Sequence, residues 1–214
     1  MKRYILLASL VTITLVASGC TSNKNNKETM SKKSKFSSQI ASVQQKNNVT
    51  KSNEELAKKL EASFKEIKDL KKPNIEDARD FQASLRNGSV IMISRDNSSE
   101  LEVHNISMLD NFLDSFNKVK EGYVRVIKGT LKSDGKLLVN KLEEYETDGK
   151  AIKSIGYDTY ADKNKFIQGK PIYSQKIVKT CPDDGVRYAV LESKDTPDNM
   201  GATVISFKKS SIKK

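Results

Sequence analysis

The sequence predicts an α+β fold in which N-terminal helices pack on an antiparallel β-meander sheet. Apolar residues recur at helical spacing in two segments before residue 122, whereas from Tyr123 onward they alternate with polar residues. Helices followed by strands are typical of α+β folds, since α/β folds interleave the two. We expect residues 54–214 to form a single domain, because about 160 residues can bury an adequate core.

The strongest predicted helix covers residues 54–72, where Asn53 can cap the start and Pro73 ends the helix. This helix could dock on its own domain or on a partner. A short helix is expected after Pro73, and another over residues 106–121. The apolar stripe of the first helix consists of Leu56, Leu60, Phe64, Ile67 and Leu70.

Two Asp-Gly turns predict hairpins in the second half of the chain. Residues 123–131 and 137–145 flank Asp134-Gly135, and residues 151–157 follow Asp148-Gly149. Asp-Gly between alternating segments is a strong hairpin signal because both positions tolerate positive φ. Further strands are expected over residues 172–180, 186–192 and 203–207.

The N-terminus predicts export from the cytoplasm. Met1-Lys2-Arg3 is positively charged, and the apolar run from Tyr4 to Val16 is shorter than the roughly 20 residues of a membrane span. A positive start followed by a short apolar run is typical of a secretory signal peptide. An ordinary secretory signal with a chance cysteine remains the alternative to the lipoprotein signal described next.

The run ends in Leu15-Val16-Ala17-Ser18-Gly19-Cys20, which resembles the lipobox of bacterial lipoprotein precursors. The resemblance implies that Ala17, Ser18 and Gly19 are recognised by the signal peptidase. It also implies that residues 1–19 are removed and that Cys20 carries a diacylglyceryl group. Two acyl chains, at about 0.8 kcal/mol per buried methylene, anchor a protein stably. We therefore expect a lipid-anchored protein on the extracytoplasmic face of the cell membrane, and no internal disulfide involving Cys181.

Residues 20–53 are predicted to be a disordered, basic tether. They hold seven lysines and one acid, Glu28, among mostly polar residues, so they cannot bury enough apolar surface to fold. The charge of the remaining chain is nearly balanced. Because the basic segment adjoins a lipid anchor, we expect it to lie near an anionic membrane surface and not to bind nucleic acid.

The stretch from Leu109 to Asp162 resembles an uncharacterised lipoprotein family of Gram-positive bacteria, domain-of-unknown-function family 4362. The family has no assigned activity, so the resemblance implies a location and a fold. The similar segments are Leu109-Asp110-Asn111-Phe112, Val124-Arg125-Val126-Ile127, the hairpin at Gly135, Asp148-Gly149-Lys150-Ala151-Ile152, Tyr157-Asp158, Asp162-Lys163, Tyr173 to Cys181, and Tyr188-Ala189-Val190-Leu191.

No residue pattern predicts a catalytic site, a metal site or a cofactor. Metal sites need clusters of His and Cys, and this chain has one histidine, His104. Ser107 and Asp110 could complete a triad with it, but their positions are more typical of a helix start. Cys181 has no local group that would lower its pKa, so a catalytic role for it is not expected.

Carboxylates offer the remaining chemistry. Glu143, Glu144 and Glu146 lie in one predicted strand and could receive a cation, although Lys141 and Lys150 lie nearby to balance them. The sequence favours a non-catalytic binding or interaction module for an envelope protein, a peptide or a cell-wall component. The alternative is an envelope hydrolase whose carboxylates come together only in three dimensions, as a pocket containing two acids.

Overall fold

The computed structural model describes residues 54–162 and 165–213. These residues belong to one compact unit. The predictions for the signal peptide, for Cys20 and for the basic tether lie outside the described residues. Within the described ranges, no helix is long and apolar enough to cross a membrane.

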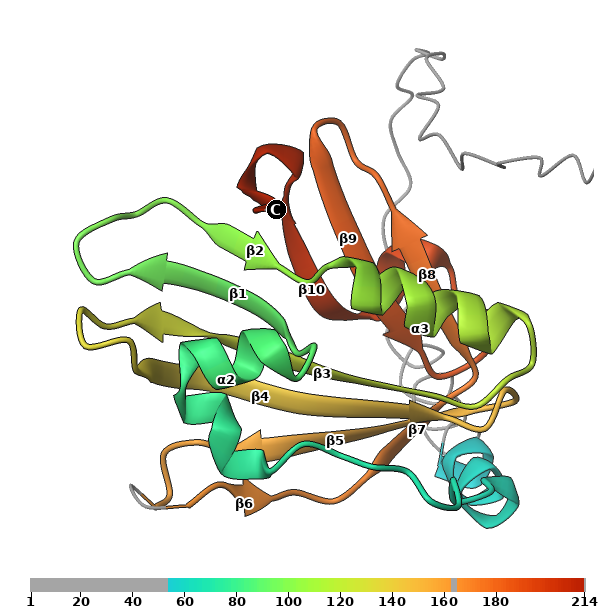
Figure 1. Ribbon diagram of the computed structural model, residues 1–214. Helices are drawn as coiled ribbons and strands as arrows, with labels where there is room; N and C mark the ends of the chain where they lie inside the picture. The colour runs from blue at the N-terminus through green and yellow to red at the C-terminus, as the bar shows by residue number, and fades with distance from the viewer. Residues whose placement is uncertain (1–53, 163–164, 214) are drawn as a thin grey trace, which may run out of the picture. The chain divides into compact units, whose positions relative to one another are not determined.

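A seven-stranded sheet forms one layer of the described residues (Figure 1). Its strand order is β2-β1-β3-β4-β5-β6, and β7 also pairs with β5. The pair β1–β3 is parallel, and the other pairs in this sheet are antiparallel. The strands are β1 (Val90–Arg95), β2 (Glu102–His104), β3 (Gly122–Leu131), β4 (Leu137–Thr147), β5 (Ile152–Asp158), β6 (Ile167–Gln168) and β7 (Ile172–Ser174).

A second, three-stranded antiparallel sheet has the order β10-β9-β8. Gln175 alone separates β7 from β8, so the chain passes from one sheet to the other at this residue. Side chains of both sheets and of the helix at residues 107–117 share one apolar core. The strands of this small sheet are β8 (Lys176–Thr180), β9 (Gly185–Leu191) and β10 (Ala202–Lys208).

Short helices cover the large sheet. Helices η1 (Ile75–Arg79) and α2 (Phe81–Arg86) pack on one side, which we call the helix face. Helix α3 (Ser107–Asn117) and the small sheet pack on the other side, which we call the cleft face. Alternation along β3 directs Val124 and Val126 to the cleft face and Ile127 to the helix face. Two further turns of helix are η2 (Asp198–Met200) and η3 (Lys209–Ser211).

The predicted fold class is wrong. The described residues form two sheets and short helices, and they do not form long N-terminal helices on one antiparallel meander. The strands of the C-terminal part were expected to continue the meander, but β8, β9 and β10 form a sheet of their own. The parallel pair β1–β3 also departs from a meander, and β2 and α3 make the crossover that it requires.

The helix predicted for residues 54–72 ends at residue 63. Residues 64–74, which we call the strap, then run without regular structure apart from a turn. Contacts with the large sheet hold the strap: the backbone N–H of Lys65 donates to Asp148 (3.1 Å), and Lys153 Nζ lies 2.7 Å from Glu66. These tertiary contacts override the helical propensity. The strap therefore docks on its own domain.

Both predicted hairpins are confirmed by the pairing of β3 with β4 and of β4 with β5. Gly135 and Gly149 adopt φ of 82° and 84° in their turns. The two turns differ in their surroundings. A Cβ atom at Gly135 would meet nothing within 4 Å, whereas one at Gly149 would lie 2.8 Å from the backbone nitrogen of Lys120.

We expect Gly149→Ala to destabilise the protein more than Gly135→Ala. Positive φ costs an alanine about 1 kcal/mol at either site. The crowding against Lys120 adds roughly 1–3 kcal/mol at Gly149 alone. Urea unfolding of the two variants measures the difference. Equal losses of unfolding free energy would contradict the crowding at Gly149.

Candidate functional site

Strand β4 carries neighbouring carboxylates that point to opposite faces of the large sheet. Glu144 and Glu146 are buried on the helix face, 2% exposed each. Glu143 lines a cleft on the other face. The surroundings of the two groups determine which of them can serve a ligand.

On the helix face, Glu144 forms a buried ion pair with Arg125 of β3. Arg125 donates to Glu144 Oε1 from Nε at 3.0 Å and from Nη2 at 2.7 Å. The Tyr123 hydroxyl donates to the same oxygen at 2.5 Å, and the Tyr157 hydroxyl donates to Oε2 at 2.9 Å. Both oxygens of the carboxylate therefore have partners from within the fold.

The same cluster binds the strap. Arg125 also donates to the backbone carbonyls of Pro73 (2.7 Å) and Asn74 (2.8 Å). Lys72, at the end of the strap, pairs with Glu146. Because each guanidinium nitrogen of Arg125 already has an acceptor, the cluster is a structural clamp that holds the strap on the sheet and leaves no group for a ligand.

Burial by itself would raise the pKa of Glu144, but hydrogen bonds from Tyr123, Arg125 and Tyr157 hold that pKa below its ordinary value of 4.5. Burial and the Glu144 carboxylate also raise the pKa of Tyr123. The clamp therefore keeps a charged carboxylate beside neutral phenols at neutral pH.

A pH dependence of stability follows. A carboxyl group whose pKa is lower in the folded than in the unfolded chain stabilises the fold at pH values above its unfolded pKa. This stabilisation is lost as the pH falls from about 4.5 through the folded pKa of Glu144. We expect the free energy of unfolding to decline in this window, and to decline less steeply in Glu144→Gln. Urea unfolding between neutral pH and about pH 3 measures both slopes. The exposed Glu100→Gln serves as control and should keep the wild-type slope.

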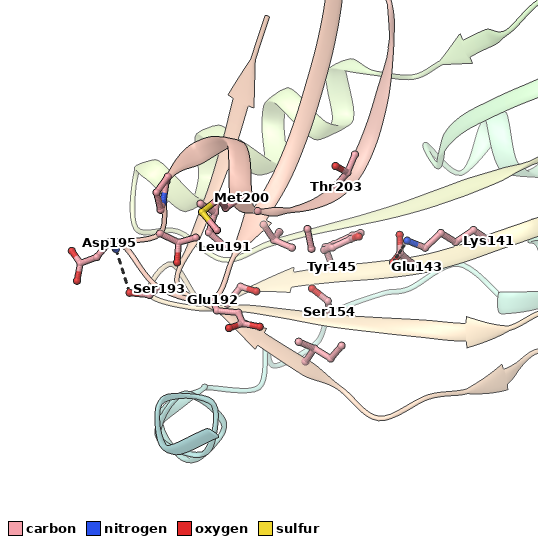
Figure 2. A pocket seen from close by; sticks show the side chains of 17 residues that line it. Lys141, Glu143, Tyr145, Ser154, Leu191, Glu192, Ser193, Asp195, Met200 and Thr203 are labelled. Atoms are coloured by element: carbon pink, nitrogen blue, oxygen red, sulfur yellow. Dashed lines mark hydrogen bonds and ion pairs between the residues drawn. The ribbon is translucent and has the colours of Figure 1, made fainter. Parts of the chain in front are cut away.

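The cleft on the other face lies between the large and the small sheet and has a volume of about 730 Å³. Figure 2 shows Lys141 and Glu143 toward one end and Asp195 and Met200 toward the other. Its walls come from β4, β5 and β7 of the large sheet, from β9 and β10 of the small sheet, and from the connection between β9 and β10.

The floor of the cleft is polar and incompletely hydrogen-bonded. Glu143 Oε1 lies 2.8 Å from Lys141 Nζ, but the buried Oε2 makes no hydrogen bond of good geometry within the described residues. The buried Oγ of Ser154, on β5, likewise has no partner there. Burial, the charge of Glu143 and a hydrogen bond with Glu143 raise the pKa of Tyr145. A buried polar atom without a hydrogen-bond partner costs roughly 1–3 kcal/mol.

The rim of the cleft carries two exposed apolar side chains. Ile172 on β7 is 64% exposed and Met200 in η2 is 72% exposed, although both are large hydrophobic side chains. They come from opposite walls of the same cleft. Concave sites with apolar walls and a few convergent polar groups are typical of ligand-binding sites.

The wall that carries Met200 is held firmly in place. Arg187 of β9 donates to the backbone carbonyls of Asp198 (3.0 Å) and Gly201, and Lys176 pairs with the Asp198 carboxylate at 2.7 Å. A Cβ atom at Gly201 would lie 2.8 Å from the Leu191 side chain, so only glycine allows this close approach. The cleft is therefore largely preformed.

The structure does not assemble the triad that was considered for His104. His104 Nε2 lies 3.2 Å from Glu102, and its ring packs edge-on against Phe81. Asp110 instead accepts hydrogen bonds from Tyr188 and Lys179, both at 2.7 Å. His104 therefore contributes to the packing of β2 against α2. Asp110 joins α3 to β8 and β9.

Cys181 directly follows β8 and is disulfide-bonded in the structure. This differs from the prediction of no internal disulfide. Among the described residues, no group of three or more His, Cys, Asp or Glu side chains could hold a metal ion. The sequence did not predict the cleft as a site, although it did predict Glu143 and Lys141 to be neighbouring charges.

Comparisons with known proteins identify no relative. No protein-family model matches the chain. No curated protein and no solved structure matches it either.

Proposed function

We propose that this protein is a lipid-anchored binding module of the cell envelope that holds its ligand in the cleft between its two sheets. The lipobox-like residues before Cys20 support the anchor and the extracytoplasmic location. The cleft supports binding, and the observation that carries this part is that two exposed apolar side chains, Ile172 and Met200, line one concave surface together with polar groups.

The exposed apolar side chains carry a cost. Ile172 and Met200 keep large apolar surfaces in water. A ligand that fills the cleft would cover both of these surfaces, because both residues line it.

The ligand candidates are an envelope protein, a peptide or a cell-wall component. A cleft of about 730 Å³ suits a small molecule or a short segment of chain better than a protein surface. We therefore propose a fragment of wall peptide or glycan as the ligand class to be tested first.

The test is a titration of the full-length chain in detergent with soluble peptidoglycan fragments, each a disaccharide with its stem peptide. We expect the methyl NMR signals of Ile172 and Met200 to shift on binding. Val119 provides the control, because it is 64% exposed and does not line the cleft.

Uniform shifts, or none at the two cleft methyl groups, would contradict binding in the cleft. Cleavage of the fragments during the titration would favour the alternative hydrolase. In that case Glu143→Gln should abolish the cleavage, because Glu143 is the carboxylate at the polar floor of the cleft.

A further inference from the structure

We infer that the amine of Lys128 is a reactive nucleophile that forms an imine with an apolar aldehyde or ketone at the open end of the cleft face. Three features carry this inference: the pairing of Lys128 with a second lysine, the surroundings of its amine, and the exposure of this end of the sheet. The reaction does not depend on the binding function proposed for the cleft.

Lys128 lies directly opposite another lysine in the large sheet. It belongs to β3, where it shares the cleft face with Val124 and Val126, and its cross-strand partner on β4 is Lys141. The Cβ atoms of such partners lie about 5 Å apart, and like charges in this arrangement destabilise a sheet. The repulsion between the two lysines is relieved when one of the two amines gives up its proton.

The two lysines differ in their partners. Lys141 is 49% exposed and pairs with Glu143 at 2.8 Å. Lys128 is half-buried, and within the described residues its amine has no hydrogen bond and no ion pair at contact distance. Its other neighbours on this face are uncharged, since Met92 pairs with it on β1 and Thr130 follows two positions later on its own strand. Lys128 is therefore the amine that loses its proton more readily.

The charges around Lys128 favour the neutral amine. Burial lowers the pKa of Lys128, and the positive charge of Lys141 lowers this pKa further, whereas the carboxylate of Glu143 opposes them with a smaller effect. At neutral pH a larger fraction of Lys128 than of an ordinary lysine is therefore unprotonated. Desolvation and a neighbouring cation are both known ways of activating a lysine for attack on a carbonyl group.

The amine of Lys128 is open to solvent. In the part of the chain that the structure describes, the side-chain atoms that are both shielded from solvent and without a hydrogen-bond partner belong to Arg79, Glu143 and Ser154. Lys128 is absent from this group although its amine has no partner. A small reagent can therefore reach the nitrogen.

This end of the cleft face also offers an apolar surface. Leu138 pairs with Thr130 across β3 and β4, so it lies on the same face as Lys128. The Leu138 side chain is 52% exposed, so neither α3 nor the small sheet covers this end of the face. The apolar body of a carbonyl compound can lie against Leu138 while its carbonyl group approaches the amine of Lys128.

The proposed step is a condensation without oxidation or reduction. The lone pair of the Lys128 nitrogen attacks the carbonyl carbon, and a proton moves from nitrogen to oxygen to give a carbinolamine. Loss of water from the carbinolamine leaves a C=N bond between the ligand and Lys128. Addition of water reverses the reaction and releases the ligand unchanged.

The test traps the imine on the full-length protein in detergent. Benzaldehyde is the probe, and sodium cyanoborohydride reduces the C=N bond to a stable benzylamine that tandem mass spectrometry locates. At pH 7 we expect Lys128 to react about threefold faster than Lys170, or more, because the neutral fraction rises tenfold for each unit by which a pKa falls. Lys170 is the control, since it is exposed. The ratio should decrease above about pH 11, where both amines are neutral.

Two substitutions of Lys141 separate its charge from the rest of the site. Lys141→Met removes the cation and leaves Glu143 to attract the Lys128 ammonium, so the preference for Lys128 should disappear. Lys141→Arg keeps the positive charge, so the preference should remain. A lysine that is only more accessible than the others would react alike in the two variants.

Equal reaction of Lys128 and Lys170 in the wild type at pH 7 would overturn the inference, as would the absence of reaction at Lys128. A preference that persists in Lys141→Met would overturn the activation by the lysine pair. The proposed binding function has its own readout, the shifts of Ile172 and Met200 with wall fragments, so the failure of either proposal is distinguishable from the failure of the other.

Discussion

Arg125→Met is expected to lower the free energy of unfolding by about 3–5 kcal/mol, the cost of leaving a buried charge without its partner. Arg125 and Glu144 have side chains only 1% and 2% exposed, and they form a direct ion pair at 2.7 Å. The substitution would also remove the donors of the Pro73 and Asn74 carbonyls. Urea unfolding measures the loss.

The matched control is Arg95→Met. Arg95 also pairs with a glutamate, Glu102, at 2.7 Å, but its side chain is 54% exposed. Exposed ion pairs contribute little to stability, so we expect a much smaller loss than for Arg125→Met. Equal losses would contradict the assignment of the buried pair as the main clamp of the strap.

The double variant Arg125→Met with Glu144→Leu separates the ion pair from the packing around it. Removing both charges leaves no uncompensated ion, so stability should recover in part relative to Arg125→Met. The recovery should be incomplete because the strap carbonyls still lack donors. Proteolysis near residues 64–74 should be faster in both variants, since the strap is then held less firmly.

The local elements of this fold could be predicted from the sequence, and their assembly could not. The turns at Gly135 and Gly149 were predicted because the Asp-Gly signal is local. The strand alternation around Tyr188 also predicted β9, but a period of two does not indicate which sheet a strand joins. The first helix was predicted to reach residue 72 because its apolar stripe continues, but it ends at residue 63. The following residues form the strap because they contact Asp148 and Lys153, which are distant in sequence.

The cleft could be predicted only in part for the same reason. The sequence placed Glu143, Glu144 and Glu146 together as a strand of carboxylates near Lys141. Strand alternation already implies that Glu143 faces away from the other two. What the sequence could not give is the second wall, because Met200 and Glu143 come to line one cleft only through the separate packing of the small sheet.

Cys20→Ala is expected to abolish the lipid anchor. Two acyl chains on Cys20 would supply roughly 0.8 kcal/mol per buried methylene, and the described residues contain no membrane-spanning helix to replace them. The measurement is the intact mass of membrane-extracted protein. We expect residues 20–214 plus a diacylglyceryl group in the wild type, and no product of that mass in the variant.

The same mass tests the chemistry at Cys20. A lipidated chain and an unlipidated chain differ in mass by the diacylglyceryl group. Lipidation would place the cleft at the envelope, where wall peptides and glycans are available. An unlipidated product would contradict the anchor, and the cleft would then have to be tested against soluble peptides instead.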